Sequence, residues 1–378
     1  MPPERLRIVL AAMVAGVPDH GGWIWAVMQW ALGLRSLGHD VLLLEPTDET
    51  TPAHDAAFDA AVERFGMTGS AAMVGPGRRS RPLDDAEVRA WCASADLLVN
   101  IGGVLADAEL FEPVGARVYV DVDPGFTQLW QAVEGIDMRL GGHTAYATVG
   151  LNIGSPACDV PTCGLDWLPI LPPVVLDRWP CDHPLERRAL TTVANWRGYG
   201  SVEHGGVLHG QKAHSWRALL PVAARSAVPC TPALAIHPRE RHDLAALDEH
   251  HWRLLDPAAV AGTPEGYHRF VSGSLAELGI AKSGYVVSRC GWFSDRSACY
   301  LAAGRPVIAQ DTGFAHHLPV GEGLLAFDGI DDALEAIASV EADYDRHREA
   351  ARTIATDHLD ARRVLPRLID HATGSATP

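Results

Sequence analysis

Apolar runs of strand length alternate with longer segments of helical spacing in the first part of the chain. Leu6–Val14 and Asp40–Leu44 are such runs, and between them apolar residues recur at helical spacing from about Gly22 to Leu37. Two further apolar runs, Asp96–Asn100 and Arg117–Val122, end in polar or glycine residues. Alternating strands and helices predict an α/β domain with a parallel sheet, and a ligand cleft at the carboxyl ends of its strands.

A second unit follows a proline-rich stretch. The prolines between Trp167 and Pro180 exclude a regular helix and predict an extended connector. The pattern then restarts with a strand at Thr191–Trp196, a glycine-rich turn and a helix from about Lys212 to Ala224. Because 378 residues exceed what one core usually supports, we expect two domains. Their predicted ranges are 1–170 and 181–355, joined by a linker at 171–180, with a final helical segment at 356–378.

The most informative stretch is Lys282–Phe314. Its pattern predicts a strand at Tyr285–Val287, a turn at Ser288–Ser297, a helix that ends at Gly304, and a second strand from Pro306. At such a turn the helix start offers unpaired backbone N–H groups and the positive end of the helix dipole, which favour a diphosphate. The stretch therefore predicts half of a nucleotide-binding unit.

The end of that stretch, YLAAGRPVIAQDTG, resembles the donor-binding element of GT-B nucleotide-sugar glycosyltransferases. The resemblance implies a GT-B-like α/β fold, with two Rossmann-like domains facing a central cleft. It also implies an N-terminal acceptor domain, a C-terminal donor domain and a last helix that crosses back to the first domain. Retaining members carry two glutamates where this chain has Gly291 and Cys299, so the resemblance leaves the retaining mechanism and that subfamily's ribose contact open.

The resemblance also implies a donor site. An arginine and a lysine in the first turn of the donor domain neutralise the diphosphate in retaining members, and Arg197 and Lys212 match that role. Asp295 is the nearest carboxylate for the ribose hydroxyls, while Arg289 or Arg296 could face the diphosphate. The predicted donor-binding residues are Arg197, Lys212, Arg289, Trp292, Ser294, Asp295, Arg296 and Ser297. Lys212 and Lys282 are the only lysines of the chain, and we attribute this preference for arginine to genome composition.

The acceptor side is predicted from loops that follow the strands of the first domain. The loop Gly16–Trp25 resembles the acceptor loop of GT-B enzymes, and its His20 could take a proton from an acceptor hydroxyl. Equally, Asp19 or His20 could only cap the next helix. His143 is a further candidate base, with a hydrogen-bonded structural histidine as the alternative. The predicted catalytic residues are His20, Asp19 and His143, and the predicted acceptor-binding residues are Gly21, Gly22, Trp23 and Asp123.

The composition of the chain limits which partners and metal sites we expect. The net charge of -16 argues against nucleic acid. The seven cysteines include no C-x-x-C pair, which predicts neither a zinc site nor a disulfide framework. The Asp121-x-Asp123 pair stands beside a Pro-Gly sequence, which predicts a turn there rather than a metal site. The early apolar run is interpreted as a buried strand rather than a signal peptide, which predicts a cytoplasmic protein without a membrane segment. The sequence leaves open whether the protein forms a homodimer.

These patterns together predict a metal-independent, cofactor-free glycosyltransferase. It would move a sugar from a nucleotide diphosphate donor to a small-molecule acceptor. Two alternatives remain from the sequence: a nucleotide-sugar epimerase of the same fold, and a non-catalytic nucleotide-binding partner protein. A dehydrogenase is disfavoured because Gly198 and Gly200 are followed by Glu203 instead of the third glycine of a dinucleotide fingerprint.

Overall fold

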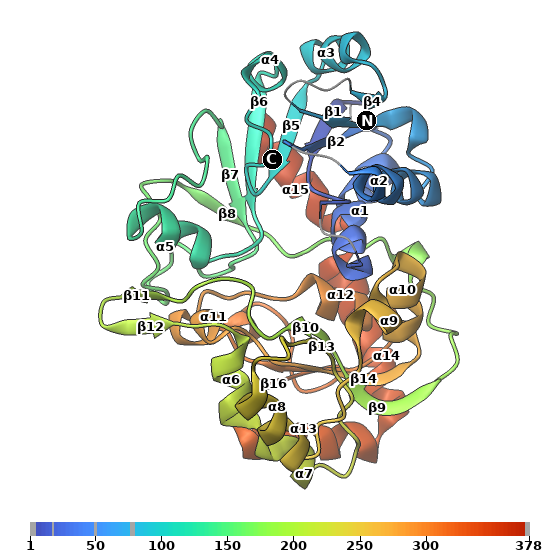
Figure 1. Cartoon of the computed structure of the whole chain (residues 1–378), viewed down its shortest axis with the longest axis vertical. Helices are drawn as coiled ribbons and strands as arrows, with labels where there is room; N and C mark the ends of the chain where they lie inside the picture. Colours follow the sequence, from blue (N-terminus) through green and yellow to red (C-terminus); the bar gives the residue numbers. More distant parts are fainter. Residues whose placement is uncertain (1–4, 17–18, 49–50, 76–79, 375–378) are drawn as a thin grey trace.

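A mostly parallel sheet forms the centre of the N-terminal half in the computed structural model, which describes residues 5–16, 19–48, 51–75 and 80–374 (Figure 1). The strand order is β4-β3-β2-β1-β5-β6-β7-β8, and only the β3–β4 pair is antiparallel. The strands are β1 Arg7–Ala11, β2 Asp40–Pro46, β3 Ala71–Val74, β4 Arg81–Pro82, β5 Leu97–Ile101, β6 Ala116–Asp121, β7 Ala145–Thr148 and β8 Trp167–Pro169. Every residue of β5 is buried, as expected for a strand covered on both faces.

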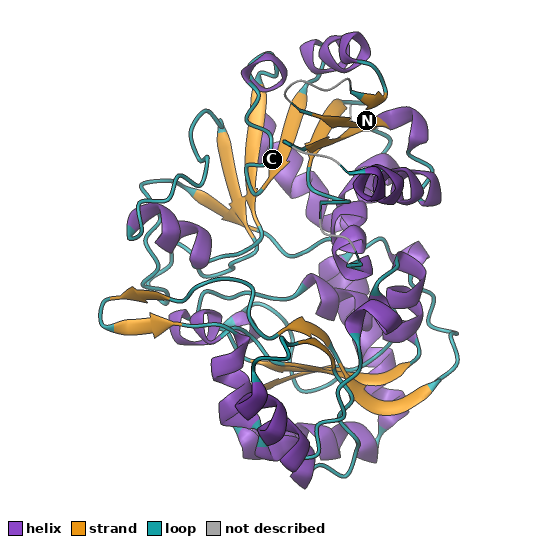
Figure 2. Cartoon of the chain, in the orientation of Figure 1, coloured by secondary structure: helices purple, strands orange, loops and turns teal. Residues whose placement is uncertain are grey.

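Helices cover both faces of this sheet (Figure 2). Side chains of α1 (Gly21–Ser36) and α2 (Pro52–Arg64) pack against one face, and those of α3 (Asp85–Ala93) and α4 (Ala108–Phe111) against the other. The remaining short helices of this half are η1 Thr68–Ser70 and α5 Phe126–Ala132. Since β1 leads directly into α1, the start of α1 lies at the carboxyl edge of the sheet, where ligand sites of open α/β sheets form.

The C-terminal half contains a second, smaller parallel sheet with the strand order β16-β15-β14-β9. Its strands are β9 Arg187–Thr191, β14 Ser274–Gly279, β15 Val307–Gln310 and β16 Leu324–Phe327. A parallel pair, β10 Val193–Asn195 with β13 Ala233–Ala235, and a hairpin, β11 Val202–His204 with β12 Val207–His209, accompany it. The helices are η2 Leu176–Arg178, α6 Lys212–Leu219, α7 Pro221–Arg225, α8 Arg241–Glu249, α9 Pro257–Ala261, α10 Pro264–Ser272, α11 Ser283–Ser288, α12 Asp295–Ala302, η3 Phe314–His316, α13 Ile330–Ala342 and α14 Tyr344–Ile354.

One strand of the predicted nucleotide-binding unit is misplaced. Tyr285–Val287 is part of the helix α11, and the strand that pairs with β15 is β14. The β-branched run suggested a buried strand, yet Val287 is 48% exposed, whereas all six residues of β14 are buried, including Glu277. The helix α12 begins at Asp295, inside the predicted turn that was to end at Ser297. The end of the helix and the next strand agree with the prediction, since Gly304 adopts a positive φ of 64° and β15 follows.

The two halves are joined twice. After β8 the chain passes to the second half, and Val174 in this segment forms a β-bridge with Asp360. The π-helical turn Ala355–Leu359 then leads into α15, Ala361–Thr373, which returns to the first half and packs against α1, β6 and β7 (Figure 1). Gly33 permits this close packing, since a Cβ there would lie 2.6 Å from Leu365 Cδ1. No helix among the described residues is long and apolar enough to cross a lipid bilayer.

Candidate functional site

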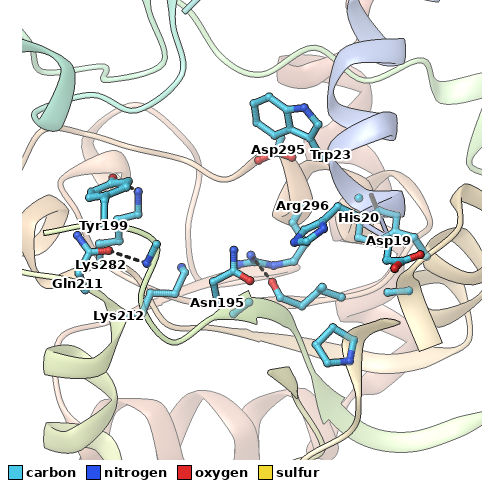
Figure 3. A pocket seen from close by; sticks show the side chains of 17 residues that line it. Asp19, His20, Trp23, Asn195, Tyr199, Gln211, Lys212, Lys282, Asp295 and Arg296 are labelled. Carbon is cyan, nitrogen blue, oxygen red and sulfur yellow. Dashed lines mark hydrogen bonds between the residues drawn. The ribbon is translucent and has the colours of Figure 1, made fainter. Parts of the chain in front are cut away.

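A cavity of about 280 Å³ lies between the two halves (Figure 3). It is bordered by the starts of α1, α6, α11 and α12 and by the segment after β9. Its principal side chains are Asp19, His20, Trp23, Asn195, Tyr199, Gln211, Lys212, Lys282, Asp295 and Arg296. Three of these helices have eight or more residues, so their amino-terminal N–H groups and dipoles make the cavity electropositive.

Three cationic side chains line this cavity. They are Arg296 and both lysines of the chain, Lys212 and Lys282. Lys212 is 9% exposed; its Nζ donates a hydrogen bond to the carbonyl oxygen of Ile280 at 2.8 Å and lies 5.3 Å from the centre of the Trp292 ring. Burial, and then the like charges of Arg296 and Lys282, hold the pKa of Lys212 well below its usual range. An anionic ligand would relieve this cost.

Arg296 is fixed by a buried ion pair. Its Nε donates to Oε1 of Glu277, which is fully buried on β14, and its Nη1 donates to the carbonyl oxygen of Val193 at 2.9 Å. The hydroxyl of Thr192 lies 3.3 Å from the same Glu277 oxygen. These contacts use two of the three guanidinium nitrogens, so the guanidinium is oriented at the cavity wall by contacts that a ligand need not supply.

Asp295 is the first residue of α12 and is exposed to the cavity. Protein surrounds it on most sides, and this partial loss of water raises the pKa of its carboxyl, while Arg296 acts in the opposite direction. Ser294 caps the same helix by accepting a hydrogen bond from the Arg296 backbone N–H at 3.2 Å. Asp295 and Trp23 also border a second, smaller recess beside the cavity.

A polar cluster links the two halves at the edge of the cavity. Asp123, which follows β6, has both carboxylate oxygens 3.0 Å from Nζ of Lys282, and it accepts hydrogen bonds from the hydroxyls of Tyr199 and Tyr285. Burial, reinforced by the charge of Asp123, raises the pKa of Tyr199. Asp123 therefore joins the first sheet to a lysine that lines the cavity, and we name Asp123, Tyr199, Lys282 and Tyr285 the interdomain cluster.

Replacing Asp123 with asparagine should lower the free energy of unfolding by about 2 kcal/mol, because hydrogen bonds to a charged group contribute roughly 1.5–3 kcal/mol. Urea denaturation measures this loss. Asp177→Asn is the matched control: its partner Arg362 and Asp177 itself are both mostly exposed, and exposed pairs contribute about 0–1 kcal/mol. Equal effects of the two substitutions would contradict the assignment of a structural role to the interdomain cluster.

The structure brings some predicted donor residues together and separates others. Lys212, Asp295 and Arg296 line the cavity, and Trp292 borders the adjoining recess. Arg197 does not line the cavity; its Nε forms an ion pair with Glu240 at 2.7 Å.

The other predicted donor residues also lie outside the cavity lining. Arg289 has a positive φ of 46° and forms an ion pair with Asp311 at 3.3 Å. Ser294 and Ser297 are buried within the start of α12.

Four residues of the predicted acceptor side line the cavity: Asp19, His20, Gly22 and Trp23. Val17 and Pro18 of the same loop lie outside the described residues. Gly21 is buried, and a Cβ there would lie 2.1 Å from the backbone oxygen of Thr263, so this position requires glycine. His20 precedes α1, but its side chain makes no capping hydrogen bond to that helix.

His143 lies outside the cavity. Its Nε2 is 3.1 Å from the amide nitrogen of Asn100, and its ring meets those of Phe111 and Tyr119 edge to face, with centroids 5.0 and 5.2 Å away. Burial lowers its pKa. These contacts match the structural alternative for His143. No group of three or more described His, Cys, Asp or Glu residues is arranged to hold a metal ion.

Several cavity residues carried no sequence signal as donor-site residues. Asn195, Tyr199 and Gln211 belong to the segment in which Arg197 and Lys212 matched the family pattern, but none of the three stands at a position of that pattern. Lys282 was not predicted because its partner, Asp123, stands 159 positions earlier in the chain. The scarcity of lysine could have indicated this site, since both lysines of the chain line the same cavity.

Comparisons with known proteins give matches at the level of structure. No family model matches the sequence, and no curated protein sequence matches it. An α-glucosyltransferase in complex with UDP and a 13-mer DNA superposes with a TM-score of 0.62 at 12% identity, over 98% of this chain and 99% of that chain. Anabaena HepE with UDP and glucose gives 0.58 at 10% identity (97% and 99%), and AviGT4, a glycosyltransferase of avilamycin A biosynthesis, gives 0.52 at 14% (98% and 99%).

The predicted exclusion of nucleic acid as a partner is wrong. It was drawn from the net charge of -16, but the matched α-glucosyltransferase structures include complexes with DNA. Net charge sums the whole surface, whereas contact with a phosphate backbone depends on where the basic residues gather. An acidic net charge is therefore insufficient to exclude a nucleic-acid acceptor.

The matches extend over nearly the whole length of both chains, so they cover both sheets and the cavity between them. The predicted fold class, two Rossmann-like α/β domains facing a central cleft, is confirmed. The chain thus has the GT-B fold of nucleotide-sugar glycosyltransferases.

Proposed function

We propose that this protein is a glycosyltransferase that moves a sugar from a nucleotide diphosphate donor to the hydroxyl of a small-molecule acceptor. The observation that carries the proposal is the meeting of both lysines and Arg296 at one cavity where three longer helices begin. Two negative phosphates are the ligand that such a set of cations and helix starts favours. UDP is the first nucleotide to test, because structures that share the fold hold UDP.

The cations also supply the chemistry that the reaction needs. The acceptor oxygen forms a bond to the anomeric carbon while the bond from that carbon to the phosphate oxygen breaks. The electron pair of the broken bond leaves with the nucleoside diphosphate, where Lys212 and Arg296 stabilise the added charge. We propose this direct neutralisation without a metal ion or another cofactor.

The proton of the acceptor hydroxyl needs a base at the cavity. His20 is the proposed base, since it precedes α1 at the cavity wall and histidine is the side chain that most often serves as a general base. Asp19 borders the same wall as the second candidate.

The test is a mass-spectrometric assay of sugar transfer from UDP-sugars by the wild-type protein and a His20→Asn variant. The panel of acceptors includes aromatic alcohols and DNA. We expect a product that contains the sugar, and a turnover number about 10²–10⁴-fold lower in His20→Asn with an unchanged affinity for UDP, because general base catalysis contributes that much. Sugar transfer to DNA alone would overturn the small-molecule acceptor.

The same assay separates the alternatives. Interconversion of UDP-sugars without any acceptor would identify an epimerase. Tight UDP binding with neither transfer nor interconversion would identify a non-catalytic nucleotide-binding partner, an alternative raised by Gly291 and Cys299.

A further inference from the structure

A recess of about 60 Å³ adjoins the cationic cavity between α1 and the start of α12. Trp23, Ala26 and Trp30 of α1 form one side of it. Trp292 and Phe293 contribute from the second half, and among the described residues Asp295 is its only charged lining residue. The cavity and the recess share Trp23 and Asp295, so these residues mark the junction between them.

The aromatic walls are held in place. The indole nitrogen of Trp23 donates a hydrogen bond to the carbonyl oxygen of Met13 at 2.6 Å. The Trp292 ring packs against Tyr285 with centroids 4.6 Å apart, and Phe293 meets Phe314 at 5.3 Å. Walls that are already ordered lose little side-chain freedom when a ligand binds, which favours stacking of a ring between them.

The size of the recess limits what it can hold. By the rule that one water needs about 10–15 Å³, it has room for roughly four to six water molecules, which is the scale of a small flat ring system and smaller than a sugar chain. Apart from Asp295 and the indole nitrogens, its lining is apolar and offers too few partners for the several hydroxyls of a sugar, whose burial without hydrogen bonds is costly. A flat, apolar ring satisfies both limits.

We infer that this recess binds a flat apolar ring of the acceptor and directs the hydroxyl of that ring to the Trp23–Asp295 junction. The inference rests on the proposed function and narrows it to acceptors such as phenols and other aromatic alcohols. A ring seated in the recess places its hydroxyl at the edge of the cavity that holds Lys212, Arg296 and His20. The bond changes are those of the transfer step above, with the ring oxygen as the attacking atom.

Calorimetric titration with 2-naphthol tests the recess on the full chain. Ala26→Leu adds side-chain atoms where the ring would lie, so we expect naphthol to bind about tenfold more weakly or worse, because extra atoms force displacement or strain. Trp292→Ala removes one wall and should also weaken binding. Ser36→Phe, in the last turn of α1 and exposed, is the matched control that keeps the wild-type affinity.

UDP titrations of the same variants separate this inference from the proposed function. Unchanged UDP affinity with lost naphthol binding in Ala26→Leu supports the recess. Naphthol binding that Ala26→Leu leaves unchanged overturns the recess, even if UDP binds. Failure of UDP to bind the wild-type protein counts against the proposed function, while naphthol binding that depends on Ala26 would still support the recess as a site for flat apolar ligands. The recess assignment would also be overturned if methyl glucoside or a hydroxymethylated DNA duplex bound in place of naphthol.

Discussion

Arg296→Ala should be the most destabilising single substitution at this site, with a loss of about 3–5 kcal/mol in the free energy of unfolding. The reason is that Glu277, the ion-pair partner of Arg296, remains in the core. Glu277 is fully buried and loses its ion pair, and its Oε2 already has no hydrogen-bond partner among the described residues. An uncompensated buried carboxylate is strongly unfavourable. Urea denaturation of the wild-type and variant proteins measures the loss.

The double variant Arg296→Ala/Glu277→Gln separates stability from function. Glutamine removes the charge that alanine at position 296 leaves unpaired, so the double variant should recover much of the lost stability. It should not recover UDP binding, since the guanidinium is still absent from the cavity. A double variant as unstable as Arg296→Ala would show that the cost has another origin than the charge of Glu277.

Lys212→Met should weaken UDP binding by about 10- to 100-fold, because a charge-assisted hydrogen bond to a phosphate contributes roughly 1.5–3 kcal/mol. Unlike Arg296→Ala, it should not lower the melting temperature. The folded protein lowers the pKa of Lys212, so below the unfolded pKa its ammonium opposes folding, and this cost falls as the pH rises above the folded pKa. Methionine keeps the apolar stem and removes the charge.

Arg197→Ala is the matched control for Lys212→Met. It also removes one cation, but Arg197 pairs with Glu240 outside the cavity lining, so UDP affinity should stay within about twofold of wild type. Calorimetry and thermal denaturation of both variants provide the comparison. A large loss of UDP affinity in Arg197→Ala, with none in Lys212→Met, would place the diphosphate away from the cavity described above.

The sequence predicted the architecture where local patterns determine it. The stop of α12 at Gly304 follows from a glycine rule that acts over a few residues, whereas its start at Asp295 lies inside the predicted turn. The strand β14 escaped prediction because Glu277 and Gly279 interrupt its apolar pattern. Glu277 is tolerated there only because Arg296, 19 positions later, neutralises it.

The site was predicted only where local patterns determine the position of a residue. Lys212 and Arg296 stand at helix starts, which local patterns reveal. The interdomain cluster joins Asp123 to Lys282, and no local pattern connects positions so far apart. Arg197 fitted the expected turn by type and spacing, but Glu240 on the neighbouring segment holds its side chain.

The most direct test of the central claim is a calorimetric titration of wild-type protein and Lys212→Met with UDP, dTDP, GDP and ADP, and with uridine as the reference without phosphates. The cavity assignment predicts that one nucleoside diphosphate, with UDP the first expected, binds the wild-type protein. UDP should bind about tenfold or more tightly than uridine, and this advantage should shrink in Lys212→Met. Absence of binding by all four diphosphates, or equal affinity for UDP and uridine, would contradict a diphosphate site at Lys212 and Arg296.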